Sequence, residues 1–248
     1  MERLRKFFSD NPRVAIAFSG GVDSAFLLYA AKHFGAEATA YYMKTPFQPQ
    51  FETDDAVRLA SELDMPMVVL KGNPLEDEDV VKNPSNRCYY CKRIIFSSIL
   101  KKASEDGFGV ILDGTNASDD ISDRPGYKAL QEMKVLSPLK SCGLTKDEIR
   151  RLSKEAGLFT WNKPSYACLA TRIPTGTSLT EELLERTEKA EDYLFSLGFS
   201  DFRVRYRDGN ALLEMKEEQL PLLLEMRENI ARELKRYYKG VALSLECR

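Results

Sequence analysis

The hexapeptide SGGVDS at residues 19–24 constrains the fold of this chain more than any other segment. It follows an apolar stretch with strand character, residues 13–18, and precedes a helix-like stretch, residues 25–34. Paired glycines let the backbone approach an anion closely, and the start of a helix presents N–H groups and a positive dipole end. The Walker lysine and the G-x-G-x-x-G spacing are both absent from it. We therefore expect a phosphate-binding turn of another type, with a glycine turn that merely caps a helix as the alternative.

Apolar stretches alternate with amphipathic ones through the first two-thirds of the chain. The sequence predicts strands at residues 13–18, 36–42, 66–70, 110–113 and 135–138, and helices at residues 25–34, 54–63, 91–103 and 145–156. Such alternation calls for a parallel sheet covered by helices on both faces. In a Rossmann-like, doubly wound sheet, ligands bind at the carboxyl ends of the strands, where the hexapeptide would lie. We predict an α/β domain of this kind over residues 1–176.

The pattern changes after an irregular stretch, residues 159–178, that is rich in Pro, Gly, Ser and Thr. Beyond it we expect helices at residues 180–197 and 216–239, and strands at residues 201–206, 211–215 and 241–246, with Asp208-Gly209 as a hairpin turn. These elements would form a smaller α+β domain over residues 177–248. Its core would be thin, so we expect it to dock on a neighbour or to build a homo-oligomer.

The charge balance bears on the partners of the protein. Lys and Arg number 36 against 38 Asp and Glu, which gives a formal net charge of −2. Proteins that bind nucleic acid usually carry a basic surplus, so we do not expect a nucleic-acid partner. No apolar run approaches the roughly 20 residues that span a bilayer, and the first residues have no signal-peptide core. A cytoplasmic protein without a membrane partner is therefore expected.

The hexapeptide also carries polar side chains suited to a nucleotide phosphate. Ser19 and Ser24 add hydroxyl donors to the backbone of Gly20 and Gly21. Asp23 is an acid within a phosphate-binding turn, which is reasonable if it helps to hold Mg²⁺ on a pyrophosphate group.

Cysteines supply the second chemical signal. Cys88 and Cys91 form a C-x-x-C pair at the start of a helix, a spacing that brings two thiolates to one metal or cluster. A zinc half-site or a redox pair is the alternative for these two. Cys168 lies alone in the irregular stretch, whereas Cys142 and Cys247 are interpreted as small buried hydrophobic residues.

SGGVDS resembles the signature of the PP-loop ATP pyrophosphatase superfamily. A wider set of segments resembles the LarE-type sulfur transferases of that superfamily over nearly the whole chain: CYYCK at 88–92, DGTN at 113–116, RPG at 124–126, ACLATRIP at 167–174 and FRVRY at 202–206. The resemblance implies an ATP-dependent sulfurtransferase that adenylates a carboxylate of pyridinium-3,5-biscarboxylic acid mononucleotide. It implies conversion to a thiocarboxylate for the nickel-pincer nucleotide cofactor, with release of AMP and pyrophosphate.

The same resemblance implies roles for individual residues. It assigns ATP binding to Ser19, Gly20, Gly21, Asp23, Ser24, Gly114, Thr115 and Arg124, catalysis to Asp23, Cys168 and Arg172, and substrate contacts to Arg203, Arg205, Glu191 and Glu214. Arg203 and Arg205 alternate along one strand and so share a face. Leu222 stands where the spacing would place a further acid of the family, which departs from the family pattern.

The sulfur source differs between members of this family. Some sacrifice the cysteine that matches Cys168, while others hold a 4Fe–4S cluster through three cysteines. Cys88, Cys91 and Cys168 are all present here, which favours the cluster, reloaded by sulfide or a sulfur donor. A sacrificial Cys168 remains an alternative, as do a tRNA thiolation enzyme, an amide-forming ligase and a non-catalytic nucleotide or cluster sensor.

Overall fold

The computed structural model describes residues 1–120 and 125–247, and its contacts divide the chain into two compact units. The first unit comprises Met1–Pro74 and Asn86–Ser165, and the second comprises Leu75–Ser85 and Tyr166–Arg248. The contacts thus assign a short segment, residues 75–85, to the second unit. The domain boundary at residues 176 and 177 stays a prediction.

Four parallel strands form the sheet of the first unit, in the order β3-β2-β1-β4. They are β1 (Arg13–Ala17), β2 (Glu37–Lys44), β3 (Met67–Lys71) and β4 (Ile111–Leu112). The register pairs Ala15 of β1 with Thr39 on one side and with Ile111 on the other. The strand order reverses between β1 and β4, which makes the carboxyl ends of these two strands the switch point where ligands bind. The predicted Rossmann-like α/β fold is confirmed.

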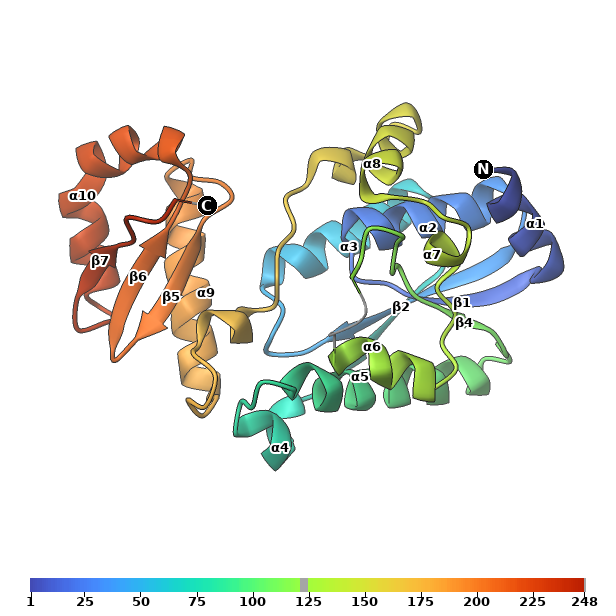
Figure 1. Cartoon of the computed structure of the whole chain (residues 1–248), viewed down its shortest axis with the longest axis horizontal. Helices are drawn as coiled ribbons and strands as arrows, with labels where there is room; N and C mark the ends of the chain where they lie inside the picture. Colours follow the sequence, from blue (N-terminus) through green and yellow to red (C-terminus); the bar gives the residue numbers. More distant parts are fainter. Residues whose placement is uncertain (121–124, 248) are drawn as a thin grey trace. The chain divides into compact units, whose positions relative to one another are not determined.

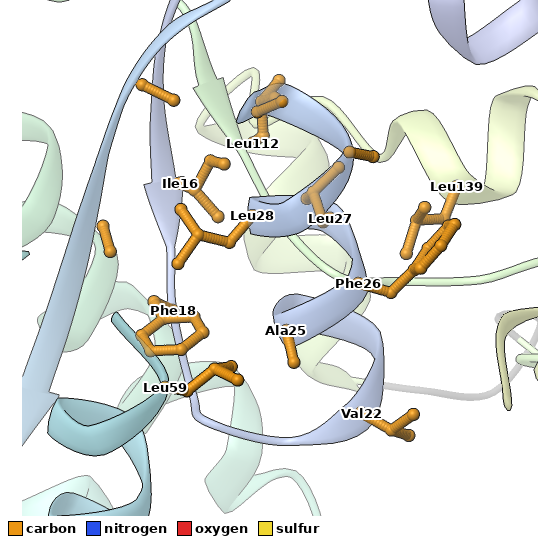
Figure 2. Close-up of a cluster of buried hydrophobic side chains, with 14 of the residues drawn as sticks. Ile16, Phe18, Val22, Ala25, Phe26, Leu27, Leu28, Leu59, Leu112 and Leu139 are labelled. Carbon is orange, nitrogen blue, oxygen red and sulfur yellow. The ribbon is translucent and has the colours of Figure 1, made fainter. Parts of the chain in front are cut away.

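Helices cover both faces of this sheet (Figure 1). They are α1 (Glu2–Asp10), α2 (Val22–His33), α3 (Gln50–Glu62), α5 (Arg87–Glu105), α6 (Pro125–Glu132), α7 (Pro138–Ser141) and α8 (Lys146–Glu155). Alternate residues of β1 face opposite layers: Val14 and Ile16 pack with α1, α2 and α8, whereas Ala15 packs with α5 and α6. Figure 2 shows the first of these cores, in which side chains of α2 meet those of β1, α3, β4 and α7. In the described part of the chain, no helix is long and apolar enough to cross a membrane.

The fifth strand that we expected at residues 135–138 does not form. Leu136 makes only an isolated parallel bridge to Leu112, and α7 begins two residues later at Pro138. Proline lacks the N–H group that a strand ladder needs, but it is well suited to the first turn of a helix. The predicted strand was therefore wrong, and of its residues Val135 and Pro138 are buried whereas Leu136 is exposed.

A three-stranded sheet, in the order β5-β6-β7, forms the centre of the second unit. Its elements are α4 (Glu78–Val81), a short 3-10 turn η3 (Leu169–Arg172), α9 (Glu181–Ser196), β5 (Arg203–Arg207), β6 (Asn210–Glu214), α10 (Leu220–Leu234) and β7 (Val241–Leu243). Asp208 and Gly209 form the predicted hairpin turn, with φ angles of 50° and 89°. Helix α10 starts later than expected, because Pro221 occupies its first turn.

Candidate functional site

The predicted phosphate-binding segment, residues 19–24, follows β1 at the switch point of the sheet, and its last three residues are the start of α2, which begins at Val22 and not at residue 25 as expected. Gly20 has a φ of +72°, and a Cβ atom there would lie 3.0 Å from Ala56 Cβ of α3 and 3.3 Å from the carbonyl oxygen of Glu52. Only glycine fits this position, because the turn is both left-handed and closely packed. The turn is thereby held against α3, with its backbone at the carboxyl edge of β1.

Two serine hydroxyls brace the turn from inside. Ser24 Oγ accepts a hydrogen bond from the backbone N–H of Ser19 (3.2 Å) and donates one to the carbonyl oxygen of Gly21 (3.2 Å). The hydroxyls of Ser19 and Ser24 are also in contact at 3.0 Å. Gly21 is the N-cap of α2 and supplies no side-chain cap. The first N–H groups of α2 thus have no side-chain acceptor at the N-cap, as an anion-binding helix start requires.

Asp23 is held on both of its oxygens. Its Oδ2 accepts from Lys146 Nζ at 2.6 Å, and its Oδ1 accepts from Asn116 Nδ2 at 3.3 Å. The side chains of Asp23 and Lys146 are 22% and 27% exposed, so the pair is accessible to a ligand. Neither partner of Asp23 was predicted.

The segment DGTN after β4 lies against the turn. Asp113 accepts hydrogen bonds from the hydroxyls of Thr115 and of Ser137, the latter at 2.6 Å. Gly114 packs so closely on the start of α2 that a Cβ atom there would lie 2.9 Å from the backbone nitrogen of Ser24. The structure therefore brings Gly114 together with the turn, whereas Arg124 lies outside the described residues.

Substitution of Gly114 by alanine is expected to weaken nucleotide binding. The added methyl group meets backbone rather than a movable side chain, so the start of α2 must shift. Such overpacking costs about 1–3 kcal/mol. If this cost is expressed as a loss of ATP binding, the dissociation constant of ATP rises roughly tenfold to a hundredfold. Calorimetric titration with ATP measures this effect. Gly109→Ala is the matched control, because a Cβ atom there meets nothing within 4 Å; equal affinities in the two variants would contradict the prediction.

A second acidic cluster lies near the turn, on α3. Lys163 Nζ pairs with Asp55 Oδ2 at 2.7 Å and with Glu52 Oε1 at 2.9 Å. Burial raises the pKa of Glu52, and the neighbouring ammonium of Lys163 opposes that rise. The cluster fixes the end of the first unit to the helix that packs on Gly20. We did not predict this cluster, since a lysine in an irregular stretch reads as a surface residue.

The cysteines of the candidate metal site belong to different units. Cys88 and Cys91 lie one turn apart at the start of α5 in the first unit, and Cys168 precedes η3 in the second. All five cysteines of the chain are thiols. Within the described residues, no group of three His, Cys, Asp or Glu side chains is arranged to hold a metal ion. The three-cysteine set therefore stays a prediction. Cys142 is half-buried and Cys247 is exposed, so the expectation of burial was wrong for Cys247.

Arg172 and Glu191 form a buried ion pair in the second unit. Their side chains are 0% and 1% exposed, and Arg172 Nε lies 2.9 Å from Glu191 Oε1. Glu191 also accepts from the hydroxyl of Tyr166 and from the backbone N–H of Val204. Arg172 Nη1 donates to the carbonyl oxygen of Ala167 at 2.8 Å. Both carboxylate oxygens of Glu191 therefore accept hydrogen bonds, and Arg172 is connected to the backbone next to Cys168.

The other pair of predicted substrate residues lines a pocket of about 290 Å³ in the second unit. Arg205 Nε pairs with Glu214 Oε1 at 2.5 Å, and Arg205 Nη1 donates to the carbonyl oxygen of Thr171 at 2.8 Å. The pocket is lined by Thr171, Arg172, Pro174, Arg205, Tyr206, Arg207 and Glu214. Arg203 is only 6% exposed, and its guanidinium lies over the ring of Tyr166. Of the two arginines that were predicted to contact substrate, Arg205 lines the pocket and Arg203 does not; Arg207, which we did not predict, also lines it.

Comparison with known proteins gives three informative matches, although no family model matches the chain. An uncharacterised protein of Synechocystis sp. is 35% identical over 221 residues, which cover 89% of this chain and 82% of that protein. The pyridinium-3,5-bisthiocarboxylic acid mononucleotide synthase of Lactiplantibacillus plantarum is 33% identical over 227 residues, 91% of this chain and 82% of the synthase. The tRNA-specific 2-thiouridylase MnmA of Pseudothermotoga lettingae is 30% identical over 200 residues, 66% of this chain and 57% of that enzyme. The first two matches extend over parts of both units.

Proposed function

Because this chain belongs to the LarE-type family of sulfur transferases in the PP-loop superfamily, we propose that its substrate is pyridinium-3,5-biscarboxylic acid mononucleotide. It adenylates a carboxylate of this substrate and then exchanges the activated oxygen for sulfur. The observation that carries the proposal is the cluster at the switch point of the first sheet. There the braced turn, the start of α2 and Gly114 surround a partly exposed acid, Asp23. A nucleotide phosphate fits the N–H groups, and the acid accounts for a metal ion on that phosphate.

The chemistry follows from the leaving groups. A carboxylate oxygen of the substrate attacks the α-phosphorus of ATP, the bond from that phosphorus to the bridging oxygen breaks, and pyrophosphate leaves with the electron pair. Hydrosulfide then attacks the acyl carbon and AMP leaves, which yields the thiocarboxylate. The residues that act on ATP are the backbone of Gly20 and Gly21 and the hydroxyls of Ser19 and Ser24. Thr115 braces Asp113 beside them, and Arg124 is proposed as a further phosphate contact.

The arginine pocket of the second unit suits the phosphate of the substrate nucleotide. Arg205 offers a planar guanidinium that can bind a phosphate in a bidentate manner. Glu214 holds that guanidinium at 2.5 Å and so fixes its direction. Arg207 lines the same pocket and adds a positive charge. We propose that these residues select a mononucleotide rather than a free pyridine carboxylate.

Two inorganic groups are implied by this function. The carboxylate of Asp23 and the phosphates are the hard oxygen ligands that Mg²⁺ prefers, and the metal would neutralise phosphate charge there. Cys88, Cys91 and Cys168 are thiols, the donor type that a 4Fe–4S cluster takes, and the first two are one helical turn apart; we propose them as its three protein ligands. Such a cluster would supply an open iron that carries sulfide. We further propose an external sulfur donor and a homo-oligomeric assembly.

Anaerobically purified protein is expected to contain about four irons and four acid-labile sulfides per chain. Replacement of Cys88 by serine should remove most of this iron, because a cluster with two protein ligands is poorly held. Cys142→Ser is the matched control, since Cys142 is a half-buried thiol outside the proposed set. Iron and sulfide analysis with the visible absorption spectrum measures the result. Wild-type protein that stays free of iron after reconstitution would contradict the cluster and leave Cys168 as a sacrificial donor.

The function itself is tested with the dicarboxylate mononucleotide, ATP, Mg²⁺ and sulfide. We expect AMP, pyrophosphate and a product whose mass reflects exchange of oxygen for sulfur. The match to the thiouridylase supports a second candidate, thiolation of tRNA. Parallel reactions with tRNA separate the two: thiolated tRNA without a thiolated mononucleotide would replace the proposal with the second candidate.

A further inference from the structure

An ion pair connects the acid of the phosphate turn to a lysine far along the chain. Lys146 Nζ lies 2.6 Å from Asp23 Oδ2, although 123 positions separate the two residues in sequence. Asn116 Nδ2 approaches the other oxygen of Asp23 at 3.3 Å. The ammonium of Lys146 thus lies at the start of α2, the place where the free N–H groups of a helix bind a phosphate.

A helix cap, a hydrogen bond and a packing contact hold the backbone of Lys146 in place. Lys146 is the first residue of α8, which begins with a complete capping box between Thr145 and Glu148. Its own N–H donates to the hydroxyl of Ser118 at 2.9 Å. Ile149 on the next turn packs into the same core as α2. The start of α8 is therefore rigid, and it places the side chain of Lys146 at the phosphate-binding turn.

Stability does not account for a lysine at this position. A cation in the first turn of a helix opposes the helix dipole and is unfavourable there. The gain from a partly exposed ion pair is small, so the two contributions nearly cancel. Lys140, by contrast, donates to the carbonyl oxygen of Asp119 at 3.1 Å and has an ordinary structural role. The placement of Lys146 is better explained by the ligand than by the fold.

We propose that Lys146 is a catalytic residue of the adenylation step, a role that rests on the proposed function. Its ammonium binds the β- and γ-phosphates of ATP and shares its donors between them and Asp23. As the substrate oxygen bonds to the α-phosphorus, the bridging oxygen departs with the electron pair and negative charge grows on pyrophosphate. A preplaced cation stabilises this charge more in the transition state than in the ground state, which is the condition for a gain in rate.

Binding of inorganic pyrophosphate tests the contact without any need for turnover. Lys146→Met keeps the length of the side chain and removes the charge. We expect calorimetric titration with pyrophosphate and Mg²⁺ to give roughly tenfold to a hundredfold weaker binding, as for loss of a hydrogen bond between charged groups. Lys154→Met is the matched control, because it removes the same charge from the other end of α8, where Lys154 lies over the ring of Trp161.

The rate of the adenylation step supplies the second readout. We expect Lys146→Met to lower kcat for pyrophosphate release by about 10²- to 10³-fold, with a melting temperature close to that of wild type. Equal affinity for pyrophosphate in Lys146→Met and wild type would overturn the inference, as would a normal kcat with a lowered melting temperature. If wild type forms no AMP with the dicarboxylate mononucleotide, the proposed function fails, and the pyrophosphate titration still decides the role of Lys146.

Discussion

Replacement of Cys168 by alanine is expected to lower thiocarboxylate formation by at least about a thousandfold, while pyrophosphate is still released. Both proposed sulfur routes use this thiol, as the donor itself or as a cluster ligand. The surrounding backbone does not depend on it, because Thr171 holds the carbonyl oxygen of residue 168 through its N–H (2.9 Å) and its hydroxyl (2.8 Å). Mass analysis of the product and a coupled pyrophosphate assay measure the two steps separately.

Cys142→Ala provides the control for this experiment, and we expect both steps to continue in it. The number of products per chain then separates the two routes in wild type. A sacrificial thiol gives one sulfur per chain and leaves a dehydroalanine, whereas a reloaded cluster gives many. Undiminished thiocarboxylate formation in Cys168→Ala would contradict both routes and exclude residue 168 from sulfur delivery.

Local signals were sufficient to predict the fold of the first unit. The alternation of apolar strands and amphipathic helices predicted the parallel sheet, and SGGVDS was correctly placed after β1 and at the start of the helix that follows it. Local signals failed where one residue overrides a pattern. Pro138 starts a helix where we expected a strand, and Pro221 delays the start of α10. Both failures follow from the missing N–H of proline, which a reading by hydrophobic period does not include.

For the candidate site, the sequence predicted residues that act through local contacts and missed those that act through long-range contacts. Glycines and the acid of the turn were predicted because their roles are set by neighbours in sequence. Lys146 and Asn116 were not, since they reach Asp23 across 123 and 93 positions. One signal was present for Lys146: it follows a good N-cap, Thr145, in a place where the helix dipole disfavours a cation. A cation at a helix start, where the helix dipole disfavours it, thus indicates that a ligand could bind there.

Burial of charge was the other property that the sequence did not reveal. Glu191 alone reads as a residue of an exposed charged face, and the resemblance implied a substrate contact for it and a catalytic role for Arg172. The structure places them in a pair with almost no exposed surface. Burial raises the pKa of Tyr166, whose hydroxyl donates to Glu191 and whose ring lies beneath the guanidinium of Arg172. Such a network forms only when α9, η3 and β5 come together, so no local pattern predicts it.

Substitution of Glu191 by alanine is accordingly expected to lower the free energy of unfolding by about 3–5 kcal/mol. The change leaves the charge of Arg172 buried without its carboxylate. It also removes the acceptor of the Val204 N–H and of the Tyr166 hydroxyl. Urea denaturation followed by circular dichroism measures the loss. Glu214→Ala is the control, because its pair with Arg205 is 20% and 34% exposed and should contribute no more than about 1 kcal/mol.

A double variant separates the contribution of the Arg172–Glu191 pair to stability from its role in positioning the backbone next to Cys168. Arg172→Met with Glu191→Leu removes both charges, and apolar replacements of a buried pair often restore stability. We expect this variant to be more stable than Glu191→Ala, because no charge stays buried without its partner, but to deliver sulfur poorly. The reason is that Arg172 Nη1 no longer holds the carbonyl oxygen of Ala167, next to Cys168. If Glu191→Ala instead stays within about 1 kcal/mol of wild type, the carboxylate is not part of a closed network. Its direct contact with the substrate, as the resemblance implied, would then be the better account.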